Sequence, residues 1–329
     1  MYYINGFFLS QKITGIQRYS INLLNEFDNL PEKKFTVLVP FNAKYDPNKY
    51  KNIRFKKLPI FKGNLWEQIT LPFYMFFKRK PLISFGTIAP ILYPSYVVIH
   101  DIRFTSKESP ENKKWLFKMR AVTRINIKRY KHIFTETEFM KESISSYYGL
   151  LDNKISVIYA GVNGKINNTQ IKEDFFISVA SNYKHKNLKY IDEVAKLNSK
   201  LNFVIIGEVE VPKDISPNVK YLGYIDDQSM NHFYSRAKGF IMPSLYEGFG
   251  LPIVEAMMMG CRLIFISDIP VFKELFEDKV NYFDPNNPST FKDILENAIE
   301  TTSEDVDYFV KKFNWKEVAK IMLSKVCDK

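Results

Sequence analysis

The chain has 329 residues, of which 46% are hydrophobic and 25% charged, so it is long enough for two ordinary folded domains and is not a disordered chain. Its two cysteines, Cys261 and Cys327, exclude a disulfide framework, and its N-terminus lacks the charged-then-apolar pattern of a secretory signal. The formal net charge of +11 favours an anionic partner: nucleic acid, acidic lipid or a phosphate-bearing small molecule.

Short β-branched and aromatic runs alternate with helix-period segments through the first half of the chain. The strands predicted there lie at 35–40, 53–58, 82–85, 96–100, 132–136 and 155–159. Such nearly continuous apolar strands, separated by helices, are typical of a parallel sheet that is covered on both faces. After the fifth of them, Glu138 is expected to cap a helix rather than to meet a substrate.

Two segments of this half bear on membranes. The run LWEQITLPFYMFFKRK (65–80) comes closest to a membrane span, but an acid, a glutamine and a proline interrupt it. The run 113–131 is the most basic part of the chain and predicts an amphipathic helix with a basic face. Three interpretations of that face stay open: a solvated surface, contact with an anionic membrane, and nucleic-acid binding. Since no DNA- or RNA-reading motif accompanies it, no nucleic acid is expected as a partner. The apolar members of the predicted helix are Trp115, Leu116, Met119, Val122 and Ile125.

The Gly- and Asn-rich stretch 161–174 is the best candidate for a linker between two domains. The alternation of strands and helices resumes after it. Two doubly wound α/β domains are therefore expected, and in such sheets ligands bind beyond the carboxyl ends of the strands, here in a cleft between the domains. The strands predicted in the second half lie at 175–180, 202–207, 219–223, 239–243 and 262–266.

The segment SLYEGFGLPIVEAMMMGCR (244–262) places two carboxylates at the mouth of a predicted helix. Pro252 suits the first turn of that helix, so Glu247 lies on the preceding loop and Glu255 leans back toward the same loop. A nucleotide sugar fits this arrangement, because its phosphates suit free amides at a helix start and its hydroxyls suit carboxylates. The amides expected to bind the phosphates are those of Phe249, Gly250 and Leu251.

The part YEGFGLPIVEAM of this segment resembles the glutamate-seven-residues-glutamate motif of the retaining family 4 glycosyltransferases, which have the GT-B fold. Further segments are similar to that family in the expected order, and the resemblance covers nearly the whole chain. It implies two Rossmann-like domains that face a central cleft: 1–163, with a C-terminal helix at about 310–329 packing back on it, and 170–309. The further matching segments are ITGIQRY (13–19), VVIHD (97–101), SNYKHKN (181–187), SDIPVFKEL (267–275) and FNWKEVA (313–319).

The resemblance also implies roles for individual residues. Glu255 would accept hydrogen bonds from the ribose of the donor, and Lys186 would bind its diphosphate. Glu247 and His100 would contact the donor sugar, while Gly15 would let the backbone of the first domain approach the diphosphate. The catalytic residues expected on this basis are His100, Glu247 and Lys186. The donor-binding residues are Gly15, Ser181, Lys186, Glu247, Gly248, Phe249, Gly250, Leu251 and Glu255.

One phosphate ligand departs from the family pattern, because Ser181 stands where many members have an arginine. A second positive group would come from Lys184, His185 or Arg18. No metal or other cofactor is expected, since the only Asp-x-Asp triplet, at 305–307, lies at a predicted exposed helix start.

The expected activity is that of a retaining, metal-independent glycosyltransferase that moves a sugar from a nucleotide-diphosphate sugar to an acceptor hydroxyl. The resemblance implies a lipid-linked glycan of O-antigen or capsule synthesis as acceptor, and a cytoplasmic location, at the inner face of the membrane if 113–131 contacts it. A GT-B sugar epimerase and a non-catalytic nucleotide-sugar-binding or scaffold protein are the alternatives. Neither the donor sugar nor its base follows from the sequence.

Overall fold

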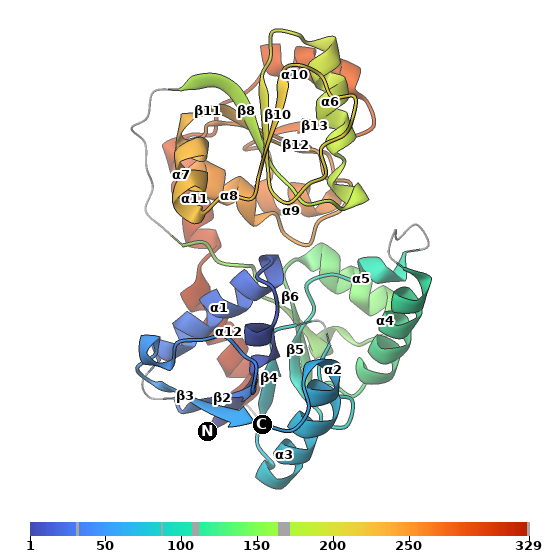
Figure 1. The fold of residues 1–329 in the computed structure, drawn as a ribbon, viewed down its shortest axis with the longest axis vertical. Coiled ribbons are helices and arrows are strands. Elements are labelled where there is room, and N and C mark those ends of the chain that lie inside the picture. The colour runs from blue at the N-terminus through green and yellow to red at the C-terminus, as the bar shows by residue number, and fades with distance from the viewer. Residues whose placement is uncertain (31–32, 87, 107–111, 164–171, 328–329) are drawn as a thin grey trace. The chain divides into compact units, whose positions relative to one another are not determined.

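The computed structural model describes residues 1–30, 33–86, 88–106, 112–163 and 172–327, and the chain forms two compact units (Figure 1). Unit 1 comprises Met1–Gly161 and Asn314–Lys329, and unit 2 comprises Val162–Phe313. The bounds expected from the sequence, 1–163 with 310–329 and 170–309, lie close to these. Most of the linker expected at 161–174 falls outside the described residues.

Unit 1 contains a seven-stranded parallel sheet with the strand order β3-β2-β1-β4-β5-β6-β7. The middle strands β4, β5 and β6 are buried along their whole length because helices cover both faces of the sheet. The strands are β1 (Tyr2–Asn5), β2 (Phe35–Pro40), β3 (Ile53–Leu58), β4 (Leu82–Ser84), β5 (Tyr96–Val98), β6 (His132–Thr135) and β7 (Ile155–Val157).

The helices of unit 1 pack their apolar sides on this sheet. Leu23, Leu24 and Phe27 form the buried side of α1, and Trp66, Leu71 and Met75 pack on Tyr3 and Leu38 of the sheet. The helices are α1 (Gly15–Asp28), α2 (Gly63–Leu65), a π-helical turn (Trp66–Thr70), α3 (Leu71–Lys78), α4 (Lys113–Asn126), α5 (Glu138–Tyr148) and α12 (Trp315–Cys327).

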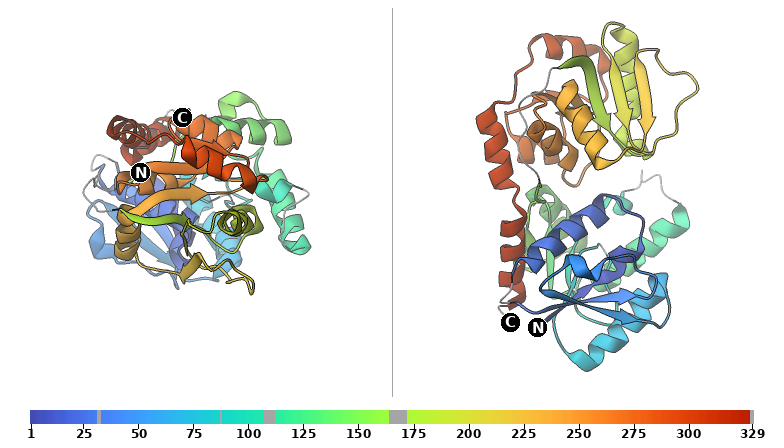
Figure 2. Two further views of the ribbon diagram at one scale, coloured as in Figure 1. Left: turned by 90° about the horizontal axis from the view of Figure 1, so that it is seen from above. Right: turned by 60° about the vertical axis from the view of Figure 1, so that its left-hand side comes forward.

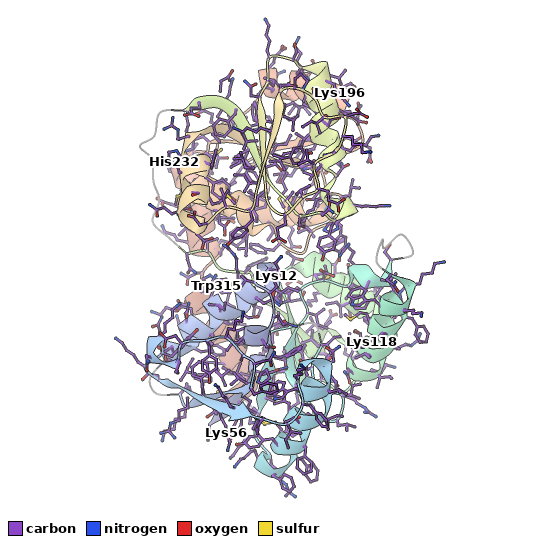
Figure 3. The ribbon with its side chains drawn as sticks, in the orientation of Figure 1. Lys12, Lys56, Lys118, Lys196, His232 and Trp315 are labelled. Carbon is purple, nitrogen blue, oxygen red and sulfur yellow. The ribbon has the colours of Figure 1, made fainter. Side chains whose placement is uncertain are left out.

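Helix α12 belongs to unit 1 although it follows unit 2 in the sequence, and it runs beside α1 (Figure 2). Trp315, labelled in Figure 3, opens this helix and packs edge-on against Tyr19 of α1 with ring centroids 4.9 Å apart. At the other end of α12, Cys327 Sγ lies 2.9 Å from the hydroxyl of Tyr2 in β1.

Unit 2 contains a six-stranded parallel sheet with the order β10-β9-β8-β11-β12-β13, and its core includes Phe176, Ile205, Ile241, Phe265 and Phe291. The strands are β8 (Glu173–Val179), β9 (Phe203–Ile206), β10 (Val219–Gly223), β11 (Ala237–Met242), β12 (Leu263–Ser267) and β13 (Asn281–Phe283). The helices are α6 (Leu188–Leu197), α7 (Asp227–Arg236), α8 (Leu251–Met258), α9 (Pro270–Phe276), α10 (Phe291–Glu296) and α11 (Ser303–Lys312).

Each strand predicted from the sequence is present, with ends that differ by a few residues, but two strands were not predicted. These are β1 (Tyr2–Asn5) and β13 (Asn281–Phe283), which have four and three residues. The basic helix expected at 113–131 ends at Asn126.

In each sheet the strand order reverses at one point, and the carboxyl ends of the strands there offer a place for a ligand. In unit 1 the reversal lies between β1 and β4, and in unit 2 between β8 and β11. In the part of the chain that the structure describes, no helix is both long and apolar enough to cross a lipid bilayer.

Candidate active site

Two loops meet at the reversal point of unit 2, one after β8 and one after β11. Lys186, from the first loop, forms an ion pair with Glu247 from the second, with 2.6 Å between Nζ and Oε1. Both side chains are mostly buried, with exposed fractions of 18% and 11%. The amide of Leu245 donates a hydrogen bond of 2.7 Å to the carbonyl of His185 and so ties the two loops together. The fold therefore joins two residues that the sequence separates widely.

The loop that carries Lys186 is held in place by Asn187, a residue that was not singled out in the sequence. Asn187 has a φ of 52°, in the left-handed region that asparagine tolerates better than most residues do. Its side-chain amide donates a 2.9 Å hydrogen bond to the carbonyl of Pro285. Asn187 thus fixes the turn between Lys186 and helix α6.

The loop that carries Glu247 ends at Gly250, the residue before α8. Gly250 has a φ of 108°, and a Cβ atom there would lie 2.9 Å from the ring of Phe272. Phe249 is buried and its ring packs edge-on against Phe313, 4.9 Å between centroids. Only the backbone of Phe249 is therefore suited to meet a polar ligand. Pro252 lies in the first turn of α8, as expected, and the half-buried Glu255 is the fifth residue of this helix.

The remaining donor-binding residues expected in unit 2 lie on the same two loops. Gly248 is half-buried on the loop after β11, and Leu251 is the first residue of α8. Ser181 is the second residue after the end of β8, and its carbonyl accepts a 2.8 Å hydrogen bond from the amide of Tyr183. Lys184 and His185 share a single 3-10 turn with Lys186. Arg18, the other candidate for a second phosphate ligand, is exposed on α1 of unit 1.

In unit 1, His100 lies just beyond the carboxyl end of β5 and is buried. Its Nε2 donates to the carbonyl of Phe85 at 2.7 Å, and its Nδ1 lies 3.1 Å from Oε1 of Glu136. Burial by itself lowers the pKa of His100, but Glu136, the Phe85 carbonyl and Asp101 together raise it above the ordinary histidine value. With both ring nitrogens donating to oxygen acceptors, this arrangement favours the imidazolium form.

Glu136 is a site residue that was not identified from the sequence. It follows β6, the neighbour of β5, so that both side chains emerge at the same edge of the sheet. The sequence feature that could have identified it is an acid at the last position of the strand predicted at 132–136. The expectation that Glu138 caps a helix is wrong in detail: Thr137 is the N-cap of α5, and its hydroxyl accepts a hydrogen bond from the amide of Met140. Glu138 is the first residue of the helix and pairs with Lys141.

Gly15 is the first residue of α1 and is exposed. Among the described residues, a Cβ atom at Gly15 would meet no heavy atom within 4 Å, and the residue does not have a positive φ. The neighbouring Thr14 is the N-cap, and its amide donates a 3.1 Å hydrogen bond to Oε1 of Gln17. Neither packing nor backbone geometry explains the glycine, which leaves room above the start of α1.

Glu67 is a buried acid close to the reversal point of unit 1. Asn5, at the end of β1, donates hydrogen bonds to Oε1 of Glu67 at 2.7 Å and to the hydroxyl of Ser84, at the end of β4, at 3.3 Å. Burial raises the pKa of Glu67 to about 7, although the hydrogen bonds from Asn5 and Gln68 oppose this shift. In the sequence Glu67 counted only as an interruption of the apolar run 65–80, and its burial was not predicted because a lone acid in an apolar helix is usually exposed.

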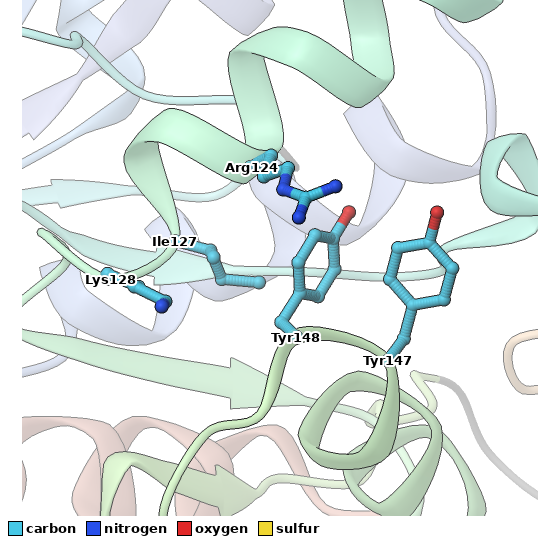
Figure 4. A pocket seen from close by; sticks show the side chains of 5 residues that line it. All are labelled: Arg124, Ile127, Lys128, Tyr147 and Tyr148. Atoms are coloured by element: carbon cyan, nitrogen blue, oxygen red, sulfur yellow. The ribbon is translucent and has the colours of Figure 1, made fainter.

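A cavity of about 130 Å³ lies elsewhere in unit 1 (Figure 4). It is lined by residues near the ends of α4 and α5, each of which leads into the next strand, so it lies toward the amino edge of the sheet. Tyr148 lines it with a buried hydroxyl that has no hydrogen-bond partner among the described residues. Its position separates it from His100 and Gly15. The other lining residues are Arg124, Ile127, Lys128 and Tyr147.

Within the described ranges, no group of three or more His, Cys, Asp or Glu side chains is arranged to hold a metal ion. The triplet at 305–307 lies at the start of α11, as expected. There Asp305 accepts hydrogen bonds from Thr302 and forms an ion pair with Lys279.

Comparison with known proteins gives a family match in unit 2 and a relative that covers most of the chain. Residues 163–313, nearly all of unit 2, match the family model described as Glycosyl transferases group 1. The O-antigen chain mannosyltransferase RfbU of Salmonella typhimurium is 26% identical over 330 residues, covering 92% of this chain and 91% of that protein.

Solved structures share the architecture. Anabaena Alr3699/HepE, in complex with UDP and glucose, aligns with a TM-score of 0.73 and 15% identity over 99% of both chains. WaaG, a glycosyltransferase involved in lipopolysaccharide biosynthesis, aligns with a TM-score of 0.69 and 12% identity over 100% of this chain and 99% of that one. Sequence identities this low show a shared fold only. The expected GT-B fold is thereby confirmed.

Proposed function

We propose that this chain, which has the GT-B fold, is a glycosyltransferase that transfers a sugar from a nucleotide-diphosphate sugar to a glycan hydroxyl in O-antigen synthesis. The acceptor in this proposal is a lipid-linked glycan. Support for the pathway comes from the relative in Salmonella typhimurium, which is named for the O-antigen chain and aligns over most of both proteins.

The observation that carries the proposal is the meeting of Lys186 and Glu247 at the reversal point of unit 2, beside the start of α8. A nucleoside diphosphate gains negative charge as it leaves the sugar, and preorganised cations and amide donors stabilise that charge. In the proposed site Lys186 binds the diphosphate, and the amides of Gly248, Phe249 and Gly250 lie near the sugar and the diphosphate. Glu247 contacts the donor sugar, and Glu255 accepts hydrogen bonds from the ribose.

We also propose roles in donor binding for residues of unit 1. The open space above Gly15 lets the backbone at the start of α1 approach the diphosphate. His100 orients the donor sugar, and its contact with Glu136 keeps the ring fixed. The second phosphate ligand is one of Lys184, His185 and Arg18.

We further propose that transfer retains the anomeric configuration and needs no metal ion. In this reaction the bond between the anomeric carbon and the diphosphate oxygen breaks, and the acceptor oxygen forms its bond on the same face. The acceptor's proton passes to the departing diphosphate oxygen, so no carboxylate acts as covalent nucleophile. Lys186 and the amide donors supply the charge stabilisation that a metal ion gives in other enzymes.

The proposed location is the cytoplasm, at the inner face of the membrane. Helix α4 supports contact with an anionic surface, because Trp115 and Ile125 are exposed on it among several lysines and arginines. Basic residues near a membrane are attracted to anionic lipid headgroups.

A thermal-shift and hydrolysis screen tests this function. The panel contains GDP-mannose, UDP-glucose, UDP-N-acetylglucosamine and dTDP-rhamnose, each with and without EDTA. We expect one donor to stabilise the protein and to be turned over equally in EDTA, and Glu255→Ala to abolish both effects. Lack of stabilisation by any nucleotide sugar would refute the donor site, and loss of turnover in EDTA would refute metal independence. Binding without any turnover would instead favour a non-catalytic nucleotide-sugar-binding protein.

A further inference from the structure

The segment 60–80 of unit 1 exposes an unusual amount of apolar surface. Exposed fractions of Phe73, Phe76 and Phe77 on α3 are 66%, 65% and 68%. Leu65, Ile69, Phe73 and Phe77 follow one another at intervals of four, so they form one stripe along α2, the π-helical turn and α3. We call this stripe and its neighbours the α3 surface: Ile60, Phe61, Leu65, Ile69, Phe73, Phe76 and Phe77, all exposed.

The three phenylalanine rings form one cluster outside the protein core. The ring of Phe77 lies edge-on to Phe73 and to Phe76, with centroids 5.1 Å and 5.9 Å apart. The opposite side of the same helices is anchored, because Trp66, Leu71 and Met75 are buried in the core beneath the sheet. The helices are therefore apolar on both sides, and only one side is covered within unit 1. Figure 3 shows the side chains of α3 extending outward from this end of unit 1.

The charge around this surface has a single sign. Between residues 56 and 80 the chain has six lysines and arginines and one acid. That acid, Glu67, is buried and hydrogen-bonded to Asn5, so no carboxylate of this segment faces solvent. The six cations, all exposed, are Lys56, Lys57, Lys62, Lys78, Arg79 and Lys80.

The end of α3 places cations directly beside the aromatic cluster. Arg79 has a left-handed backbone conformation with a φ of 50°, which ends the helix after the last exposed phenylalanine. The Nζ atoms of Lys56 and Lys78 lie 4.9 Å and 5.4 Å from the ring centroid of the half-buried Tyr74. Apolar rings bordered by an amphipathic tyrosine and by lysines and arginines are the arrangement that suits the boundary between lipid headgroups and acyl chains.

We propose that the α3 surface docks the enzyme on an anionic phospholipid bilayer, with the three phenylalanines inserted among the acyl chains and the six cations at the headgroups. A second copy of the chain fits this surface poorly, because symmetric pairing would bring like cations together with no exposed carboxylate of this segment between them. In this proposal α3 inserts, and the basic helix α4 contributes only electrostatic attraction. The inference rests on the proposed function for its lipid-linked acceptor, whereas vesicle binding is measured without donor or acceptor.

Sedimentation of the full chain with vesicles tests the proposal. The probes are vesicles of phosphatidylcholine alone and vesicles with added phosphatidylglycerol. We expect binding to the anionic vesicles that weakens with salt, and a loss of at least about tenfold in affinity when Phe73, Phe76 and Phe77 are replaced by serine. The variant Lys78→Gln/Arg79→Gln/Lys80→Gln should lose the preference for phosphatidylglycerol and keep residual binding.

Two control variants separate the α3 surface from other exposed aromatic groups. Tyr224→Ser removes a ring of unit 2 that is 70% exposed and should leave binding unchanged. Trp115→Ser/Phe117→Ser removes the exposed rings of α4 and should have much less effect than the α3 change. Equal binding by wild type and the α3 variant, or loss in the α4 variant alone, would overturn the proposal. So would a wild type that ignores vesicles and dimerises through the α3 surface.

A fluorescent probe tests insertion directly. In a Trp115→Phe background, Phe76→Trp places an indole on the α3 surface, and brominated lipids quench an indole that lies among the acyl chains. We expect strong quenching of Phe76→Trp and little in the background protein, whose remaining Trp66 and Trp315 are buried. No added quenching in a protein that sediments with the vesicles would contradict insertion. Donor hydrolysis by the same variants shows whether the proposed function stands independently of docking.

Discussion

The ammonium group of Lys186 has a carboxylate partner, and this partner must compete with any diphosphate that binds there. Glu247 holds Lys186 at 2.6 Å with little solvent between them. A bound diphosphate would therefore draw on a cation whose charge is already compensated. In the proposed donor site the pair would both position Lys186 and lower its net affinity for phosphate, which would ease release of the nucleotide product.

Because of this competition, substitutions of Lys186 and of Glu247 should change the affinity for diphosphate in opposite directions. We expect Lys186→Ala to weaken nucleoside diphosphate binding and to reduce turnover by about 10²–10³-fold, because a positioned donor to the leaving group is lost. Glu247→Gln keeps a hydrogen-bond acceptor but removes the charge, so it should tighten diphosphate binding while transfer slows. Calorimetry gives the affinity and a donor-hydrolysis assay gives the rate. Lys189→Ala, which changes an exposed lysine of the adjacent helix, is the control and should alter neither value.

Glu67 gives unit 1 a stability that depends on pH. Its pKa is raised from 4.5 to about 7, so the folded chain holds this proton more tightly than the unfolded chain does. The free energy of unfolding must then fall as the pH rises from about 4.5 to about 7 and stay at the lower value above that. The size of the effect is roughly 3–4 kcal/mol, because one pKa unit corresponds to about 1.4 kcal/mol.

Glu67→Gln should remove this dependence, since a neutral amide can still accept the hydrogen bond from Asn5. We expect the variant to be more stable than wild type by roughly 3–4 kcal/mol at pH 8 and about equal at pH 4.5. All three tryptophans of the chain, Trp66, Trp115 and Trp315, lie in unit 1, so denaturant unfolding followed by their fluorescence reports on this unit. Parallel pH profiles for the two proteins would show that Glu67 is not the titrating group.

At the scale of single elements, α8 and α1 each have a glycine at their start, and the two glycines have different explanations. Gly250 precedes α8 with a φ of 108° and would place a Cβ against Phe272 and Ile253. Gly15 opens α1 with ordinary φ and open space around it. The first glycine is therefore explained by the fold, and the second by the proposed ligand.

Alanine at the two positions should separate stability from activity. Gly15→Ala should leave the melting temperature unchanged or slightly higher, because alanine favours the helix, while donor binding falls by about tenfold or more. Gly250→Ala should cost roughly 1–3 kcal/mol of stability, because a β-carbon is forced into strained backbone and a packed ring. Melting curves and donor titrations on both variants check this. A Gly15→Ala protein that binds donor normally would remove Gly15 from the site.

The helices and strands that the sequence predicts are those whose own residues indicate a helix or a strand. Strands such as 35–40 and 239–243 are almost entirely apolar and flanked by helices, and Pro252 marks the start of α8. The strands β1 and β13 were not predicted, because a segment of three or four residues is too short to show the alternation of a strand. Only pairing within the sheet makes these residues strands. A short strand of this kind is a product of tertiary structure.

The residues of the candidate site also divide into those that the sequence predicts and those that depend on tertiary structure. Lys186 and Glu247 were expected to serve one ligand, but their direct contact depends on the neighbouring positions of β8 and β11. Glu136 and Glu67 were missed because a carboxylate becomes a buried partner only through residues far away in the chain: His100 for one and Asn5 for the other. The exposed side of α3 could not be foreseen either, since an apolar helix gives no sign of which side the protein leaves uncovered.

At the scale of the whole molecule, the chain returns to unit 1 after unit 2 is complete. Helix α12 brings Trp315 into contact with Tyr19, and the ring of Tyr19 lies edge-on to His100 with centroids 4.7 Å apart. Gly161, at the end of the first pass, leaves space for the same indole, because a Cβ there would lie 2.4 Å from the Trp315 ring. The last segment of the chain thus supports the packing behind His100.

Trp315→Ala should therefore destabilise unit 1 by about 3–5 kcal/mol, the usual cost of removing a buried tryptophan from a core. The indole nitrogen of Trp315 has no hydrogen-bond partner among the described residues, so Trp315→Phe should cost much less. Hydrogen exchange measured by mass spectrometry separates the two units: we expect faster exchange in α1, β5 and α12 and unchanged exchange in β8 and β11. Because Tyr19 loses its support, His100 should also lose its fixed position, and turnover should fall even where the protein stays folded. Uniformly faster exchange in both units would mean that α12 stabilises the whole chain and that its support of His100 is not local.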